Sequence, residues 1–210
     1  MARRNDPTSP APLSFAQQRL WFLAQLDGLD ATYNMPSAIE LLGPLNVTIL
    51  ENVFGEICHR HEALRTNFQT IDGQAYQVIR PSRDTEIAVV NLEDLTPNKQ
   101  QEEYERLALA TCHAPFDLEQ DHLLRLKLVR FSQERYILLM VVHHIVSDGW
   151  SNGNVLLKEI CTLYEAFSQG ALSPLLPLSI QYADFAQWQR RLLDGPRSDV
   201  LVKYWKNKLK

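Results

Sequence analysis

Residues 136–149 read YILLMVVHHIVSDG, an almost continuous apolar run that ends in two histidines and is followed by an Asp-Gly pair. Such a run predicts a β-strand that is covered on both faces. The preceding strand, expected at residues 123–131, alternates apolar and basic side chains, which is typical of a strand with one exposed face. Residues 132–135 would connect the two as a hairpin. This pair predicts the centre of a sheet, with both histidines where the inner strand ends.

Helices and further strands are predicted on both sides of this pair. Ser14 and Gln17 fit a capping box, in which a serine and a glutamine bond each other's backbone amides at a helix start. Asp72 and Gly73 indicate a hairpin turn, because glycine adopts positive φ freely. Other helical patterns occupy residues 50–64, 100–112, 155–167, 180–193 and 198–209, and other strand patterns occupy 66–70, 76–79 and 87–90. The fold class is therefore α/β, an α+β sandwich with a mixed, largely antiparallel sheet covered by helices.

The chain length fits one domain, preceded by a short leader. The 210 residues lie near the upper range of a single domain. Residues 1–13 contain Pro7, Pro10 and Pro12, so we expect an extended leader with order beginning at Ser14. The domain itself is expected at residues 14–210.

Composition excludes several functional classes. The net charge of -4, with interspersed signs, argues against nucleic acid as a partner, because binding many phosphates needs a basic field. The longest aliphatic run, residues 137–142, is far too short to cross a membrane. The three cysteines are widely separated and predict the reduced thiols of a cytoplasmic protein. The chain has no nucleotide-binding or metal-ligand motif, so we expect neither a metal nor a directly bound cofactor.

The two histidines and the residues after them are the candidates for chemistry. His143 and His144 are consecutive in a strand and should point to opposite faces, so only one can readily face a cleft. An imidazole exchanges a proton near neutral pH, which suits it to assist attack on an acyl carbon. Asp148 could pair with an arginine or orient an imidazole. The Gly149 amide, near the next helix start, could stabilise developing negative charge.

The run from His143 to Gly149 resembles the H-H-x-x-x-D-G motif of the chloramphenicol acetyltransferase-like superfamily. Within it, the run is similar to that of nonribosomal peptide synthetase condensation domains, because Trp150 and Ser151 follow the glycine as they do there. Three more segments resemble that family's other motifs in the same order: SFAQQRLW at residues 14–21, RHEALRTNF at 60–68 and YADFAQW at 182–188.

This resemblance implies an acyltransferase that forms a peptide bond. A carrier-bound aminoacyl amine would attack a carrier-bound acyl or peptidyl thioester. The resemblance assigns the catalytic role to His144 and a structural role to His143. It also implies that Asp148 points away from the cleft and pairs with an arginine of the second motif. We expect that arginine to be Arg60, and Arg65 is the second candidate for supporting the site.

The resemblance also implies the partners. These are the donor and acceptor peptidyl carrier proteins, which carry 4′-phosphopantetheine, so that the chain itself binds no cofactor. Family members have two similar lobes with the reaction centre between them. We therefore expect residues 14–210 to be the N-terminal lobe, with the second lobe absent, neighbouring synthetase domains as further partners and little activity in isolation. Two alternatives stay open: a non-catalytic carrier-protein docking or scaffolding lobe, and a coenzyme A dependent acyltransferase.

Overall fold

The computed structural model describes residues 1–4, 6–7, 9–28, 30–193 and 196–209. Its centre is a four-stranded sheet of order β2-β7-β6-β5. The strands of this large sheet are β2 (Asn34–Leu42), β5 (Ala88–Asn91), β6 (Leu124–Ser132) and β7 (Arg135–His143). β7 is antiparallel to both of its neighbours, and β5 joins β6 in parallel. The expected mixed, largely antiparallel sheet is confirmed.

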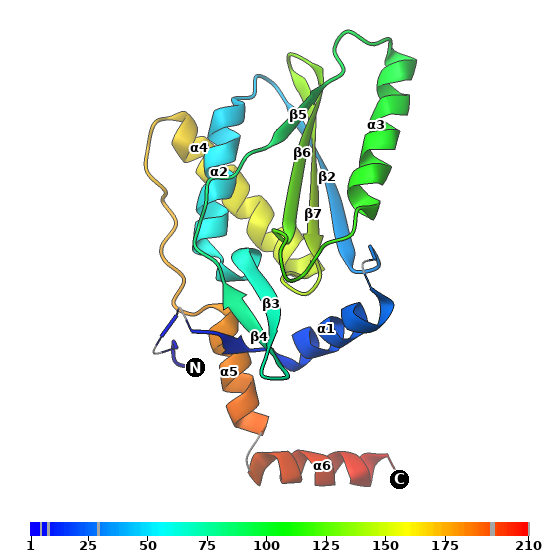
Figure 1. Ribbon diagram of the computed structural model, residues 1–210. Coiled ribbons are helices and arrows are strands. Elements are labelled where there is room, and N and C mark those ends of the chain that lie inside the picture. Colours follow the sequence, from blue (N-terminus) through cyan, green and yellow to red (C-terminus); the bar gives the residue numbers. More distant parts are fainter. Residues whose placement is uncertain (5, 8, 29, 194–195, 210) are drawn as a thin grey trace.

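A smaller sheet of order β1-β4-β3 lies beside one end of the large one (Figure 1). Its strands are β1 (Ala11–Pro12), β3 (Thr66–Ile71) and β4 (Gln74–Ile79). The β3–β4 turn is the predicted Asp72-Gly73 hairpin, in which both residues have positive φ, 51° and 78°. These angles match a turn whose twist suits antiparallel strands.

Helices cover both faces of the large sheet (Figure 1). The helices are α1 (Phe15–Asp27), α2 (Val47–Arg60), α3 (Pro97–His113), α4 (Leu157–Ser168), α5 (Tyr182–Leu193) and α6 (Pro196–Lys208), with a 3-10 turn at Glu62–Arg65 and a π-helix at Ser151–Leu156. α2 and α4 pack on one face and α3 on the other. α1 begins at the predicted capping box of Ser14 and Gln17. Within the described residues, no helix is both long and apolar enough to cross a membrane.

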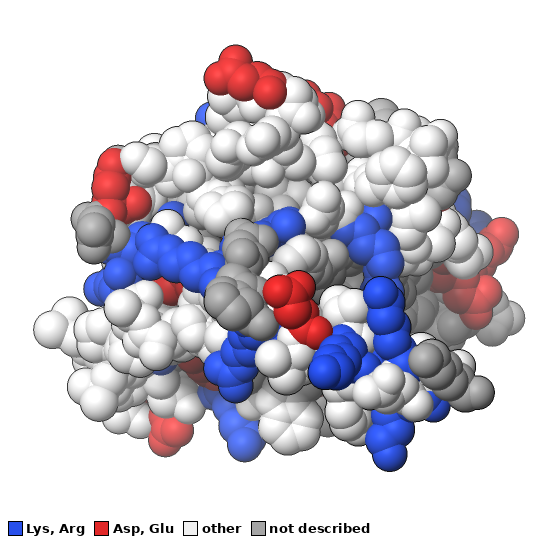
Figure 2. All heavy atoms as spheres, turned by 90° about the horizontal axis from the view of Figure 1, so that it is seen from below, with Lys and Arg blue, Asp and Glu red and all other residues white. Residues whose placement is uncertain are grey.

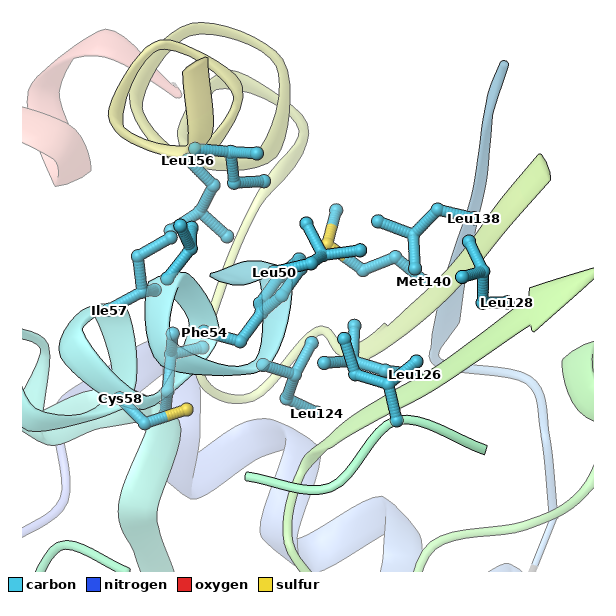
Figure 3. Packing of buried hydrophobic residues seen from close by; sticks show 14 of the residues in the cluster. Leu50, Phe54, Ile57, Cys58, Leu124, Leu126, Leu128, Leu138, Met140 and Leu156 are labelled. Carbon is cyan, nitrogen blue, oxygen red and sulfur yellow. The ribbon is translucent and has the colours of Figure 1, made fainter. Parts of the chain in front are cut away.

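The main core lies between the large sheet and the α2–α4 layer (Figure 3). Phe54 of α2 and Leu156 beside α4 face Leu138 and Met140 of β7. β7 is buried at every position from Tyr136 to His143, because it is an inner strand with helices on both faces. The prediction of a strand covered on both faces is thus confirmed, and it explains why the histidines that follow it are held firmly.

Two parts of the fold differ from the prediction. β2 was not expected, because it is an edge strand that alternates between half-buried and exposed positions and contains Pro36, which weakens a strand pattern. Order also begins before Ser14. Ala11 and Leu13 are buried, and Arg4 is held by ion pairs to other parts of the chain. The leader therefore packs on the domain rather than trailing from it.

Candidate active site

His143 and His144 lie at the end of β7, beside the start of β2. His143 pairs with Asn34 in the sheet register, and the backbone N–H of His144 donates to the carbonyl of Tyr33 at 2.9 Å. The side chain of His143 is buried and that of His144 is exposed. The central strand thus presents one imidazole to the interior and the other to the surface.

His143 is a neutral, buried ring. It lies beside Tyr33 and edge-on to Phe116, with ring centroids 6.3 Å and 6.0 Å away. The Ile145 amide donates to its Nδ1 at 3.1 Å, so this nitrogen carries no proton. Burial, followed by the nearby His144, lowers the pKa of His143 to about 4. The ring is therefore uncharged at neutral pH and has its proton on Nε2.

His144 has the opposite tautomer. Its Nδ1 lies 2.9 Å from the carbonyl oxygen of Ser147. A carbonyl can only accept a hydrogen bond, so Nδ1 must donate and carries the proton. In the neutral ring, Nε2 then has a free lone pair. An exposed nitrogen of this kind can accept a hydrogen bond or a proton from an incoming amine.

The turn after His144 is closed by its own hydrogen bonds. The Ser151 amide donates to Asp148 Oδ1 at 2.7 Å, and the Asn152 amide donates to the Asp148 carbonyl at 3.0 Å. The Ser147 hydroxyl donates to Asn152 Oδ1 at 2.6 Å. The Ser151 amide is the main reason that the pKa of Asp148 is lowered. Asp148 thus acts as a cap for the next helix, while Trp150 is 71% exposed.

The expected ion pair between Asp148 and Arg60 is wrong. Arg60 Nε donates to Glu159 Oε1 at 2.9 Å, and Arg60 also bonds the Leu176 carbonyl. Glu159 accepts a second hydrogen bond from His61, at 2.6 Å, when that ring carries its proton on Nε2. Physically, Arg60 ends α2 where α2 packs on α4, so it meets an acid of α4, whereas Asp148 is engaged at the helix start. Arg60 supports the site through α4 rather than through the motif aspartate.

Glu159 is the supporting residue that the sequence prediction missed. It lies on the same stripe of α4 as the buried residues Ile160 and Leu163. A carboxylate on such a stripe needs a partner, because burying an unpaired charge is costly. That position was the signal that could have identified it.

The comparisons with known proteins agree with this geometry. Residues 8–210 match the family model described as "Condensation domain". The chain belongs to the condensation domain family. It is 48% identical over 198 residues to part of the linear gramicidin synthase of Brevibacillus parabrevis, covering 94% of this chain and 2% of that protein. It is 46% identical over 209 residues to malpinin synthetase of Mortierella alpina, covering 100% of this chain and 3% of that protein.

Solved structures confirm the predicted chloramphenicol acetyltransferase-like fold. The X-domain from teicoplanin biosynthesis superposes with a TM-score of 0.84 at 28% identity, over 98% of this chain and 44% of that one. The starter condensation domain of rhizomide synthetase superposes with a TM-score of 0.85 at 18% identity, over 95% of this chain and 48% of that one. The chain thus spans a few per cent of the first curated relatives and about half of these solved domains. Peptide bond formation is the general function of the condensation domain.

The four condensation-domain segments meet in the structure. Gln17 of the first segment donates to the Ile145 carbonyl of the histidine segment at 3.3 Å. Ser14 of the first segment lies 3.0 Å from the Tyr182 hydroxyl of the fourth. The second and fourth segments meet at Arg4, which bonds Glu62 at 2.5 Å and Asp184 at 3.1 Å. These contacts explain why the same four segments occur together.

Arg65 lies on the second segment but bonds elsewhere. Its guanidinium donates to the Arg80 carbonyl at 2.5 Å and lies 4.0 Å from Glu62. Neither partner belongs to the turn that follows His144. Arg65 therefore ties the 3-10 turn to the end of the small sheet, and the structure gives it no direct contact with the histidine segment.

A hollow of about 260 Å³ lies next to His143. Aromatic side chains of Trp21, Tyr33 and Phe116 line it together with Asp30. Among the residues that the structure describes, no group of histidine, cysteine or carboxylate side chains is arranged to hold a metal ion. The polar groups available for chemistry beside this hollow are therefore the histidine pair and its turn.

Proposed function

We propose that this chain is the N-terminal lobe of a condensation domain that joins two carrier-bound substrates, with His144 acting at the attacking amine. The acceptor's α-amino nitrogen bonds to the donor's thioester carbon, and the carbon–sulfur bond breaks. The donor's thiolate leaves, and the amine loses one proton. The observation that carries this proposal is the fixed tautomer of His144, whose Nδ1 donates to Ser147 and leaves an exposed Nε2 free.

The role of His144 follows from the chemistry of the amine. Free α-amino groups titrate at about 7.7 to 8.0, so a useful fraction is already neutral near pH 7. Nε2 can therefore accept a hydrogen bond from a neutral amine and aim its lone pair at the thioester carbon. It can take the proton once the new bond forms. Holding the reactants in this geometry supplies a large part of such a rate enhancement.

Gly149 gives this proposal a place for the substrate. A Cβ built on Gly149 would meet no other atom within 4 Å, so packing inside this chain does not require a glycine there. Open space beside the histidine turn supports the approach of a thioester-bearing arm. His143, Asp148, Trp150 and Ser151 would then hold the end of β7 and the helix start around that approach.

The proposal includes partners that complete the site. These are a second lobe, the neighbouring synthetase domains, and donor and acceptor carrier proteins with 4′-phosphopantetheine arms. Two observations support it: the chain spans about half of the solved condensation domains, and α6 exposes aromatic and aliphatic side chains. Without the second lobe we expect this chain to show little or no turnover. We also propose a cytoplasmic location, supported by the three free cysteines.

The test uses the complete two-lobed domain that contains this sequence. A donor carrier loaded with an acyl thioester is mixed with an acceptor carrier loaded with an aminoacyl group, and intact-protein mass spectrometry follows the acceptor. We expect the acceptor to gain the acyl mass. An acceptor with a blocked α-amino group is the control and should gain nothing. Transfer from free acyl coenzyme A, but not from the carrier thioester, would contradict the proposal and favour a coenzyme A dependent acyltransferase.

A second candidate is a docking or scaffolding lobe without catalysis. It is favoured by one observation: the X-domain from teicoplanin biosynthesis, 28% identical to this chain, has been solved in a complex with OxyB. The two candidates differ at His144. Docking without chemistry predicts that the His144→Ala domain forms as much product as the unaltered domain, whereas condensation predicts a loss.

A further inference from the structure

The turn that follows His144 is held from its far side by Asn152. This side chain is buried, with 9% of the residue exposed, and lies at the start of the π-helix Ser151–Leu156. Its Oδ1 accepts from the Ser147 hydroxyl at 2.6 Å, and its backbone N–H donates to the Asp148 carbonyl at 3.0 Å. One residue therefore closes the turn through both its side chain and its backbone.

The unusual helix geometry places Asn152 at this position. The Leu157 amide donates to the Asn152 carbonyl, which is a five-residue step rather than the four-residue step of an α-helix. Such π-turns are rare and are frequent at functional sites. A buried asparagine needs hydrogen-bond partners, and Ser147 is the side chain that provides one. Asn154, two residues further along the same π-helix, is exposed instead.

We infer that Asn152 is a positioning residue for His144 and acts through Ser147. By holding the Ser147 hydroxyl, Asn152 fixes the residue whose carbonyl receives the proton on His144 Nδ1. That carbonyl determines which ring nitrogen is protonated and how the ring is turned. The inference deepens the proposed function and rests on it, because the free Nε2 matters only if His144 acts on an amine.

Removing the Asn152 side chain frees the Ser147 hydroxyl. The 147 peptide is then held less firmly, so its carbonyl can turn away from the imidazole. His144 can then place its proton on Nε2, which removes the lone pair from the outward nitrogen. The effect is on the tautomer and the orientation of His144, with no need for Asn152 to touch a substrate.

The first experiment is nitrogen-15 NMR of the imidazole rings in this chain, where the His144 signals are assigned by their loss in His144→Gln. We expect neutral His144 to have a protonated Nδ1 and an unprotonated Nε2, with widely separated nitrogen shifts. In Asn152→Ala the two shifts should move toward each other as the Nε2–H form gains population. Asn154→Ala is the matched control and should leave both shifts unchanged. Asn152→Asp keeps an acceptor oxygen and should restore them.

Ser147→Ala provides a second variant that removes the same bond from the other side and should reproduce the Asn152→Ala shifts. Unchanged His144 shifts in a folded Asn152→Ala or Ser147→Ala chain would overturn the inference. This readout needs no turnover, so a failure of the proposed function is detected separately in the carrier assay. In the complete domain, we expect Asn152→Ala to lower kcat by about 10- to 100-fold at unchanged KM, because small misplacements of reacting groups have effects of that size. An unchanged kcat would also overturn it.

Discussion

The turn that follows His144 and the helix α6 at the other end of the molecule differ in how they are held. Residues 144–152 are tied by bonds to their own turn and to the segment before β2. α6 exposes its apolar side chains, Trp205 at 57% and Val200 at 67%, and lies at the edge of the structure (Figure 1). The same lobe thus contains a completed element and an uncovered one.

The face seen from below shows the same contrast in charge (Figure 2). Lysine and arginine are spread over it between apolar surfaces, and α6 contributes Lys203, Lys206 and Lys208. Exposed apolar surface next to polar residues is typical of an interaction site. The comparison teaches that this lobe fixes its histidine by itself, whereas the surface around α6 depends on partners for its cover.

The largest stability effect is expected at Glu159, which anchors the helix that carries the turn. Glu159→Ala leaves the Arg60 guanidinium without its carboxylate partner, and breaking a buried ion pair costs about 3 to 5 kcal/mol. Urea unfolding of this chain measures the free energy of unfolding. Glu103→Ala, at an exposed pair with Arg106, is the control and should change it little. A Glu159 variant as stable as the unaltered chain would show that the turn does not depend on α4 being anchored.

A slightly smaller effect is expected from pH at His143. Its pKa is about 4 in the folded chain and about 6.5 when unfolded, so the unfolded chain binds more protons between these values. The stability contributed by the neutral ring is complete above about pH 6.5 and is lost as the pH falls toward 4, by roughly 3 kcal/mol in total.

The check for His143 is urea unfolding at a series of pH values, with His143→Gln as the comparison. Carboxylates also lose stability in acid, so the difference between the two chains isolates the imidazole. We expect the variant to depend less on pH across this window. Equal slopes for the two chains would mean that the ring is not held in its neutral form.

The smallest effect is expected at α6. Trp205→Ala should change the free energy of unfolding of this chain by less than about 0.5 kcal/mol, because the ring is largely exposed. The same change at Trp21, which is 6% exposed, should cost about 3 to 5 kcal/mol. Urea unfolding of both variants gives the comparison directly. A large loss at Trp205 would show that α6 is part of the lobe's own core.

Elements with a strong local pattern could be predicted from the sequence. The apolar run of β7, the alternation in β6, the capping box at Ser14 and the Asp72-Gly73 turn each depend on neighbouring residues, and each is found in the structure. β2 was missed because an exposed edge strand is defined by the strand it pairs with rather than by its own residues.

Long-range partners could not be predicted in the same way. Arg60 and Glu159 are 99 residues apart, and only the packing of α2 on α4 brings them together. The resemblance suggested an acid partner for Arg60, but it named Asp148, which the helix start already engages. The tautomers of the two histidines also depend on backbone groups that fold around them, Ile145 N–H for one and Ser147 C=O for the other.

The most direct test of the account is the single-turnover rate of amide formation in the complete domain, with His144→Ala compared with the unaltered protein. Rapid quenching and mass spectrometry of the acceptor carrier give the rate of the chemical step. We expect a loss of about 100-fold or more, because His144 acts at the amine. His113→Ala, at an exposed histidine far along the chain, is the control and should leave the rate unchanged. An unchanged rate in His144→Ala would contradict the account and leave this lobe as a docking module.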